Sequence, residues 1–431
     1  MEKNYGIKVE RAFLLKGKIY APASKSYTIR AVIAAGLDSR VKIVNPLFSE
    51  DTSAAIGALK KLGARIKKGK GFLDIRGFRA RPLLKSGRIN VGESGTLLRL
   101  ILPIIGLGKG KFIVNGSGTL LKRPNKPVAE ALLSLGLDLR GKDSDYRLPI
   151  SINGKGRISG GVVRVSAKIS SQAISSLLIV AALAGRDVTL VVAGRPVSRP
   201  YIDITLDVLK WAGIRIHRKG YKRFFIPAGQ SFKPKSDFVV PGDYSSAAFL
   251  IAASCLIKSD VAIAGLFEDR QGDSKIIHIL RRMGAKINRV NNEVSIKGPF
   301  DLKGIDIDCS DTPDLVPILA VLGCFAKGKT RIFNIGHLAY KESNRIQTPA
   351  DELKKLGARI RVGADSLTVE ESSLKAGIVS GRNDHRIAMA LAVCGLRTGG
   401  LTVKGAECIN KSYPRFILDM KSLGARIAIC P

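Results

Sequence analysis

This chain of 431 residues lacks cysteine motifs and long apolar runs, and it has few acidic residues. No two of its six cysteines lie within four residues of each other, which excludes the CxxC spacing of redox sites and of zinc sites. We therefore predict buried or incidental thiols. No apolar run approaches the ~20 residues of a membrane helix, and the N-terminus lacks the apolar core of a signal peptide. We expect a cytoplasmic protein without a membrane partner.

Acidic residues number only 35 against 71 Lys and Arg, so the formal net charge is +36. Such a charge usually indicates nucleic acid, an anionic membrane surface or acidic substrates as partners. The basic residues are spread along the chain, and no zinc-finger, RRM or basic-zipper motif is present. The chain is 45% hydrophobic and long enough for about two to four domains.

One short pattern recurs six times: an apolar residue, two mostly polar residues, an apolar residue, Gly, a small or apolar residue, usually Arg or Lys, and then Ile or Leu. Its glycines are Gly63, Gly136, Gly213, Gly284, Gly357 and Gly424. The pattern indicates a helix that ends at a Gly in the left-handed backbone conformation, and two segments of alternating apolar and polar residues follow. This order predicts a β-hairpin after the helix. We expect hairpins that pair 64–66 with 72–75, 214–216 with 223–226, and 285–287 with 293–296.

A polar loop followed by an apolar helix forms the other half of each repeat. The loops contain Ser, Thr, Asp or Asn, which are favoured helix N-caps, and they lie at 22–26, 92–96, 167–172, 242–246, 310–314 and 383–386. Helices such as 173–184 and 247–256 are apolar enough to be buried. Each repeat therefore reads strand, buried helix, strand, amphipathic helix, hairpin.

The sixth repeat stops one strand short, and segment 6–13 is a spare strand at the N-terminus. We infer that this strand completes the last repeat. The predicted fold class is α/β (α+β), with two domains that each hold three βαβαββ units around buried parallel helices. We expect the first domain at 17–236 and the second at 1–16 with 237–431, and the active site in the cleft between them.

The starts of the six buried helices predict an anion site, because a helix N-terminus presents unpaired N–H groups and a partial positive charge. The loops that lead into or accompany these helices carry Lys25, Arg30, Arg99, Arg123, Lys341, Arg345, Arg386 and Lys411. A small substrate with several negative charges would suit such a site.

These segments resemble the motifs of the 5-enolpyruvylshikimate-3-phosphate synthase family, in order and from end to end of the chain. The matching segments are Ser24-Lys-Ser-Tyr-Thr-Ile-Arg30, Gly92-Glu-Ser-Gly-Thr-Leu-Leu-Arg99, Ser170-Ser-Gln172, Ser198-Arg-Pro-Tyr-Ile-Asp203, Pro313-Asp314, Lys341-Glu-Ser-Asn-Arg345, Asp384-His-Arg386 and Lys411-Ser-Tyr-Pro414. Each motif alone is weak evidence, but the ordered set is specific.

The resemblance implies an enolpyruvyl-transferase-like fold and a monomeric enzyme of the shikimate pathway, which leads to chorismate and the aromatic amino acids. The implied reaction transfers the enolpyruvyl group of phosphoenolpyruvate to the 5-hydroxyl of shikimate 3-phosphate by addition and elimination, and releases phosphate. It uses no metal or organic cofactor.

The resemblance also implies the binding residues. Those for shikimate 3-phosphate are Lys25, Ser26, Arg30, Ser170, Ser171, Gln172, Ser198, Tyr201, Asp314 and Lys341. Those for phosphoenolpyruvate are Lys25, Gly95, Arg123, Gln172, Arg345, Arg386 and Lys411. Gly95 has a physical reason as well, because the absence of a Cβ lets a ligand approach its N–H closely.

The reaction needs a general base and a general acid. The resemblance implies Asp314 as the base for the 5-hydroxyl and Glu342 as the proton-shuttling acid, with Lys25 and His385 as rival proton donors. Nearby cations lower a carboxyl pKa, so Glu342 would need a desolvated environment to act as an acid. Ser245-Ser246 resembles the other helix starts, but we assign it only a capping role.

Two positions depart from the family pattern. The loop cation is expected at Arg123, although Thr119 is the alternative occupant of that position. His337 stands where the family often has Asn.

Two rival functions are considered. UDP-N-acetylglucosamine enolpyruvyl transferases share the fold and reaction but commonly use a loop Cys in the first domain, whereas all six cysteines here follow residue 254. The second rival is a nucleic-acid-binding repeat protein. For it we predict only weak, sequence-independent binding that is lost at moderate salt.

Overall fold

The computed structural model describes residues 5–38, 40–84 and 86–430, which divide into two compact units. Unit 1 comprises Met1–Pro22 and Pro241–Pro431, and unit 2 comprises Ala23–Val240. Helices and strands alternate along the chain, as expected for the mixed α/β class. Among the described residues, no helix combines the length and apolar character needed to cross a bilayer.

Unit 2 contains three four-stranded sheets. Their strands are β3 Arg40–Val44, β4 Arg65–Gly69, β5 Phe72–Arg76, β6 Gly87–Asn90, β7 Lys109–Asn115, β8 Asp138–Arg140, β9 Ile150–Lys155, β10 Gly161–Ser166, β11 Val188–Ala193, β12 His217–Lys219, β13 Arg223–Ile226 and β14 Phe238–Val239. The strand orders are β14-β3-β5-β4, β6-β7-β9-β8 and β10-β11-β13-β12. In each sheet the first pair is parallel and the other pairs are antiparallel.

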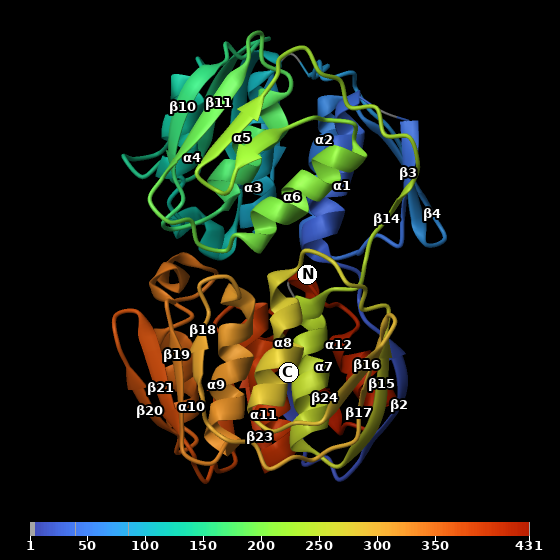
Figure 1. Cartoon of the computed structure of the whole chain (residues 1–431), viewed down its shortest axis with the longest axis vertical. Coiled ribbons are helices and arrows are strands. Elements are labelled where there is room, and N and C mark those ends of the chain that lie inside the picture. The colour runs from blue at the N-terminus through green and yellow to red at the C-terminus, as the bar shows by residue number, and fades with distance from the viewer. Residues whose placement is uncertain (1–4, 39, 85, 431) are drawn as a thin grey trace. The chain divides into compact units, whose positions relative to one another are not determined.

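The helices of unit 2 are α1 Lys25–Asp38, α2 Glu50–Leu62, α3 Gly95–Gly106, α4 Lys126–Ser134, α5 Gln172–Ala181 and α6 Pro200–Trp211, with the short 3-10 helix η1 at Gly118–Lys122. The buried helices α1, α3 and α5 lie in the interior, with the sheets around them (Figure 1). Helix α2 is amphipathic and begins with a capping box between Ser49 and Thr52. The apolar and amphipathic helices expected from the repeat are therefore both present.

Unit 1 repeats this plan. Its strands are β1 Gly6–Val9, β2 Leu15–Tyr20, β15 Ser259–Ala264, β16 Ile287–Val290, β17 Glu293–Ile296, β18 Asp306–Asp308, β19 Lys329–Phe333, β20 Arg359–Val362, β21 Ser366–Glu370, β22 Gly377–Ser380, β23 Leu401–Lys404 and β24 Ile427–Cys430. The strand orders are β16-β17-β15-β2, β18-β19-β21-β20 and β22-β23-β1-β24.

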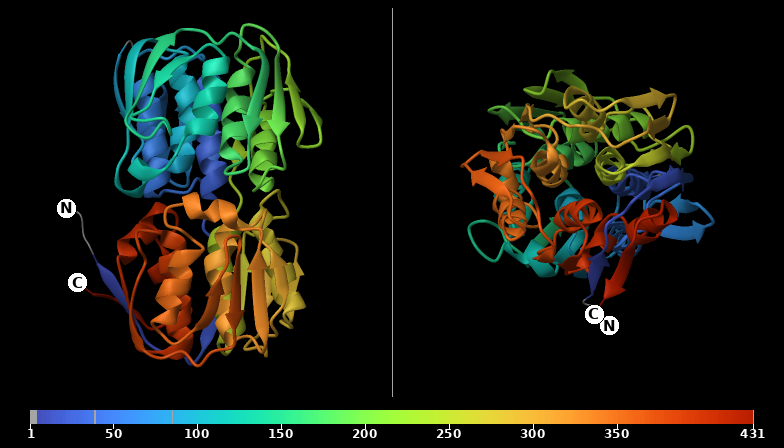
Figure 2. Two further views of the ribbon diagram at one scale, coloured as in Figure 1. Left: turned by 90° about the vertical axis from the view of Figure 1, so that its left-hand side faces the viewer. Right: turned by 90° about the horizontal axis from the view of Figure 1, so that it is seen from below.

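The helices of unit 1 are α7 Tyr244–Leu256, α8 Lys275–Arg282, α9 Val316–Phe325, α10 Gln347–Lys354, α11 His385–Thr398 and α12 Phe416–Ser422. Short 3-10 helices are η2 Gly272–Ser274, η3 Pro313–Leu315, η4 Gly336–Tyr340 and η5 Ala406–Lys411. Helices α7, α9 and α11 contact one another and form the centre of the core. Strand β1 lies between β23 and β24, as expected for a spare N-terminal strand that completes the sixth repeat (Figure 2).

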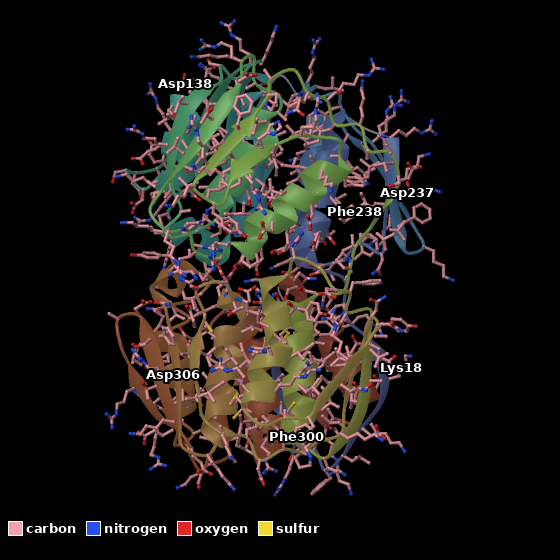
Figure 3. The ribbon with its side chains drawn as sticks, in the orientation of Figure 1. Lys18, Asp138, Asp237, Phe238, Phe300 and Asp306 are labelled. Atoms are coloured by element: carbon pink, nitrogen blue, oxygen red, sulfur yellow. The ribbon has the colours of Figure 1, made fainter. Side chains whose placement is uncertain are left out.

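At each of the two crossings, the last strand before the crossing belongs to a different unit from the helix that follows it. Strand β2 precedes α1 in sequence but pairs with β15 of unit 1 over six residues, while β14 precedes α7 but pairs with β3 of unit 2. Asp237 and Phe238, labelled in Figure 3, also belong to unit 2: Asp237 accepts a hydrogen bond from the Lys42 N–H, and Phe238 packs against Trp211. The units therefore divide after Pro22 and Val240, six and four residues later than the expected 16 and 236.

All six glycines of the recurrent pattern have positive φ, between 84° and 112°. All three expected hairpins form, at β4–β5, β12–β13 and β16–β17, but the first strands of the last two begin later than expected, at His217 and Ile287. The segment 214–216 was expected to be a strand, but this is wrong. The strand β12 begins at His217, because the backbone of Arg215 exchanges hydrogen bonds with the side chain of Gln230 instead of with β13.

Candidate active site

Arg30 on α1 connects the beginnings of three helices in unit 2. Its Nε donates to Thr205 Oγ1 on α6 at 2.8 Å, and Thr205 Oγ1 lies 2.8 Å from Ser175 Oγ on α5. The guanidinium also lies 6.0 Å from the ring centre of Tyr201. Burial lowers the pKa of Arg30 to about 10, so the side chain remains cationic at neutral pH. A buried permanent cation at this place suits a carboxylate or phosphate.

The start of α5 is joined to the start of α3 through Gln172. Its amide oxygen accepts from Arg99 Nη1 at 2.7 Å, and its amide nitrogen donates to Thr96 Oγ1 at 2.9 Å. Lys25 at the start of α1 forms an ion pair with Asp51 on α2 at 3.0 Å. Two of the helix starts that the sequence predicted to bind anions, those of α3 and α5, are thus joined directly, and α1 is linked to α5 through Arg30, Thr205 and Ser175.

Three polar atoms of this region are buried without a hydrogen-bond partner among the described residues: Ser24 Oγ, Ser198 Oγ and Arg30 Nη2. Ser198 also has a φ of 54°, a conformation that is strained for a residue with a side chain. Unsatisfied buried donors are costly. Their grouping at helix starts is the arrangement that a bound anion would satisfy.

Arg123 follows η1 and is 7% exposed. A Cβ added to Gly95 would lie only 2.6 Å from Arg123 Nη1, so the guanidinium packs directly over the start of α3. Thr119, the alternative loop residue, is half-buried within η1. Because Arg123 lies beside Gly95, the structure favours Arg123 over Thr119 as the occupant of the loop position at which the family has a cation.

Arg345 organises the site residues of unit 1. It donates to Asp314 at 2.6 Å, to Glu342 at 2.8 Å and to both oxygens of Asp384 at 2.8 and 3.0 Å. Its side chain is only 2% exposed. Three carboxylates therefore hold this guanidinium, and their charges raise its pKa further although burial opposes them.

Asp314, in η3 before α9, lies between two guanidinium groups. Arg386 Nη2 donates to its second oxygen at 3.1 Å. Burial favours the protonated carboxyl, but Arg386, Arg345 and Lys341 outweigh it and hold the pKa of Asp314 well below its ordinary value. The carboxylate is consequently ionised and firmly held by its neighbours.

The start of α7 also belongs to this group, although the sequence suggested only capping. Ser246 Oγ lies 3.5 Å from Arg386 Nη1, and Ser245 donates to the buried carboxyl of Asp273. Burial raises the pKa of Asp273, and the negative charge of Asp314 raises it further. Asp243 caps α7 through the Ser245 N–H.

Lys411, at the end of η5, donates to both the carbonyl and the side-chain oxygen of Asn383, at 3.0 and 2.9 Å. His385 and Arg386 follow at the start of α11, where Asp384 is the N-cap. Lys341 follows η4 and is half-buried. The predicted site residues of unit 1 therefore lie in loops, in short 3-10 helices or at the start of α11.

Several residues of these clusters were not predicted to have a role, among them Thr205, Asp273, Asp384 and Asn383. Asp384 is the first residue of the Asp-His-Arg motif and Asn383 precedes it, so a search for partners of the motif cations would have included both. Thr205 and Asp273 carry no comparable sequence signal, because their roles depend on contacts with segments distant in the chain.

Five of the six cysteines are buried, and all six are free thiols. Burial raises the pKa of Cys309 and of Cys324 to about 12. These thiols are protonated at neutral pH and are poor nucleophiles, as expected for structural cysteines. Among residues 5–38, 40–84 and 86–430, no group of His, Cys, Asp and Glu is arranged to hold a metal ion.

Comparison with known proteins shows extensive similarity. The family model of EPSP synthase (3-phosphoshikimate 1-carboxyvinyltransferase) matches residues 9–420. The chain is 40% identical over 432 residues to the 3-phosphoshikimate 1-carboxyvinyltransferase of Methanocaldococcus jannaschii, covering 99% of this chain and 100% of the other. It is 41% identical over 418 residues to the corresponding protein of Archaeoglobus fulgidus, covering 96% and 97%.

Solved structures show the same likeness. The EPSP synthase of Acinetobacter baumannii superposes with a TM-score of 0.84 at 25% identity, over 99% of this chain and 100% of that chain. The enolpyruvyl transferase NikO of Streptomyces tendae, with a TM-score of 0.80 and 19% identity over 99% of both chains, shares the fold. The chain belongs to the EPSP synthase (3-phosphoshikimate 1-carboxyvinyltransferase) family.

Proposed function

We propose that the protein transfers the enolpyruvyl group of phosphoenolpyruvate to the 5-hydroxyl of shikimate 3-phosphate and releases phosphate, as the family to which it belongs indicates. The observation that carries most weight is the carboxylate of Asp314 between Arg345 and Arg386. This arrangement combines a base with two cations that suit an anionic substrate. The reaction belongs to aromatic amino acid biosynthesis through chorismate.

Shikimate 3-phosphate is a dianionic phosphate on a ring with a carboxylate, so it needs hydroxyl donors and a guanidinium. Ser170, Ser171 and Ser198 donate to the phosphate in this proposal, and Arg30 receives the carboxylate. The buried unpartnered atoms of Ser198 and Arg30 support these roles. Lys25, Ser26, Gln172 and Tyr201 complete the group in unit 2, and Asp314 and Lys341 contribute from unit 1.

Phosphoenolpyruvate carries a phosphate and a carboxylate, for which the proposed cations are Lys25, Arg123, Arg345, Arg386 and Lys411, together with Gln172 and the N–H of Gly95. Cations that stabilise the departing phosphate also lower the barrier to elimination. The buried guanidinium of Arg345 remains charged during the reaction because its pKa is raised.

Binding of phosphoenolpyruvate should also change Asp314. Arg386 and Arg345 hold the pKa of Asp314 low, so the carboxylate is a weak base. A substrate anion that accepts hydrogen bonds from Arg345 and Arg386 competes with Asp314 for them. The pKa of Asp314 then rises towards the range in which it can take a proton from the 5-hydroxyl.

The proton that reaches C3 of phosphoenolpyruvate requires a donor. Glu342 remains the proposed one, and its contact with Arg345 links it to the same substrate-binding cation. Lys25 and His385 are the alternatives. Replacement of each in turn, with formation and decay of the tetrahedral intermediate followed by rapid quench, would identify the donor by the step that slows.

The decisive experiment measures phosphate release from phosphoenolpyruvate in the presence and absence of shikimate 3-phosphate. We expect release only with both substrates. UDP-N-acetylglucosamine serves as the control acceptor. Turnover with the nucleotide sugar alone would establish the rival transferase and overturn the proposal.

We also propose that the enzyme is a cytoplasmic monomer. Sedimentation or size-exclusion chromatography with light scattering would test the monomeric state, for which a mass near 46.3 kDa is expected. A mass near twice that value would contradict it.

A further inference from the structure

Glu352 on α10 is a buried carboxylate to which the proposed reaction assigns no role. The residue is 0% exposed. Arg382 Nε donates to one carboxylate oxygen at 2.9 Å, and the Ser380 N–H and Lys355 Nζ donate to the other at 2.9 and 2.6 Å. A buried carboxylate is costly without such donors. The arrangement therefore depends on all of these contacts.

Two of the three donors belong to the segment 380–383, which comprises the last residue of β22 and the three residues after it. Arg382 and Asn383 have φ values of 49° and 57°, which residues other than glycine seldom adopt. Such a conformation persists when its surroundings determine it. The segment is held by Glu352 and by the hydrogen bond from the Gly381 N–H to Lys404 O at 2.8 Å.

This segment leads directly into the phosphoenolpyruvate cations. The oxygens of Asn383 hold Lys411. The next residue, Asp384, binds Arg345 through both of its oxygens and caps α11 through the Arg386 N–H at 2.9 Å. Three proposed ligands of phosphoenolpyruvate therefore depend on one short, strained segment.

Helix α10 also starts two residues after Arg345, so Glu352 fixes the segment to the helix that follows this arginine. We propose that Glu352 is a positioning residue, which sets the spacing of Arg345, Arg386 and Lys411 by holding the segment 380–383 through Arg382 and Ser380. This inference rests on the proposed function, because it assumes that these three cations bind phosphoenolpyruvate.

A purely structural role makes a different prediction. If Glu352 only stabilised unit 1, its loss would lower the folded fraction and leave the KM values of the remaining enzyme unchanged. A positioning role changes the KM for phosphoenolpyruvate more than that for shikimate 3-phosphate. Most of the residues proposed for shikimate 3-phosphate belong to unit 2, which does not contain this segment.

The test compares Glu352→Gln with the full-length wild-type enzyme. We expect the KM and the Kd for phosphoenolpyruvate to rise about tenfold, since small displacements of positioning groups have effects of this size. The Kd for shikimate 3-phosphate should change less than about twofold. Direct titration calorimetry with phosphoenolpyruvate in the presence of shikimate 3-phosphate gives the Kd without relying on turnover.

Two further variants keep the test decisive. Arg382→Gln removes the other partner of the ion pair. The Arg382 side chain is 58% exposed, so this variant should fold. It should reproduce the effect of Glu352→Gln. The double variant should be no worse than either single one. Lys355→Gln is the matched control, because Lys355 binds the same carboxylate but does not belong to the segment 380–383. The KM values of this variant should match those of the wild type.

An unchanged Kd for phosphoenolpyruvate in both Glu352→Gln and Arg382→Gln would overturn the inference, as would an equal rise for both substrates. If the wild-type enzyme itself neither binds phosphoenolpyruvate nor releases phosphate from it, the proposed function fails instead. The two failures are thus distinguishable.

Discussion

Asp314 would have an ordinary carboxyl pKa in the unfolded chain, whereas in the folded chain it accepts hydrogen bonds from two buried guanidinium groups. The change in its pKa results from these neighbours, against the opposing effect of burial. In the proposed function, this carboxylate is the base, and a substrate anion frees it by competing for the two guanidinium groups.

Asp314→Asn tests this role. The amide keeps the size of the side chain but cannot take a proton, so kcat should fall by about 10²–10⁴-fold, as for other general bases. The Kd for shikimate 3-phosphate should remain within a few-fold of the wild type. Steady-state kinetics and calorimetry give the two quantities, and a variant with near wild-type kcat would show that another group is the base.

His337 permits a test based on pH. Its pKa is lowered to about 3, first by burial and then by the charge of Lys341, against the opposing charges of Asp311 and Asp314. The unfolded chain takes up a proton near pH 6.5 while the folded chain does not. His337 therefore makes the free energy of unfolding fall as the pH decreases from 6.5 to about 3, with a slope of about 1.4 kcal/mol per pH unit.

His337→Asn should remove this slope. Asp273 contributes with the opposite sign, because burial raises its pKa and favours the folded state as the pH falls towards 4. The measurement is therefore the difference between wild type and variant in urea unfolding at several pH values. A difference that does not change between pH 7 and pH 4 would show that His337 is protonated in the folded protein.

At the scale of the helix and hairpin, the recurrent glycine has a conformational function. Gly284 follows α8 with a φ of 108°, and a Cβ there would meet only Asp301 O at 3.4 Å. Gly57 lies within α2, and a Cβ there would meet nothing within 4 Å. The two glycines therefore differ mainly in backbone conformation.

Gly284→Ala should lower the free energy of unfolding by about 1–2 kcal/mol, the cost of a left-handed residue with a side chain. Gly57→Ala should instead raise it by about 0.5–1 kcal/mol, because Ala favours the helix interior. Chemical unfolding of both variants in the same buffer gives the comparison. Equal effects of the same sign would contradict a conformational role for the repeat glycine.

At the scale of the whole molecule, the charge of +36 is much larger than the proposed site needs. Part of it lies in rows on the outer faces of the sheets. Arg40, Arg76 and Arg65 are paired across three neighbouring strands, and all are exposed. Side chains that end in nitrogen project from the outer strands and loops in Figure 3. Opposed like charges on a sheet are destabilising, and added salt screens them.

We predict that oligouridylate binds weakly at low salt and dissociates at about 0.2 M salt, because this contact would be purely electrostatic. The triple replacement of Arg40, Arg65 and Arg76 by Gln should weaken the binding further. Fluorescence anisotropy at two salt concentrations is sufficient. Tight, sequence-specific binding at the higher salt would indicate a second function and restore the nucleic-acid alternative.

The sequence by itself determined the repeat, the buried helices and the left-handed glycines, because these depend on residues within one or two helical turns of each other. It also determined the family and the group of cations, because both are contained in short motifs. Strand β1 could be placed in the last sheet by counting strands.

Tertiary structure alone decided the partners of the strands at the two crossings and which residues hold the site together. Strands β2 and β14 pair with strands more than 190 residues away in the sequence, and no local pattern specifies these partners. Glu352 and Asp384 act on cations contributed by other segments, through contacts that no local pattern encodes. Long-range pairing depends on the complete packed chain, which is why these features became visible only in the folded structure.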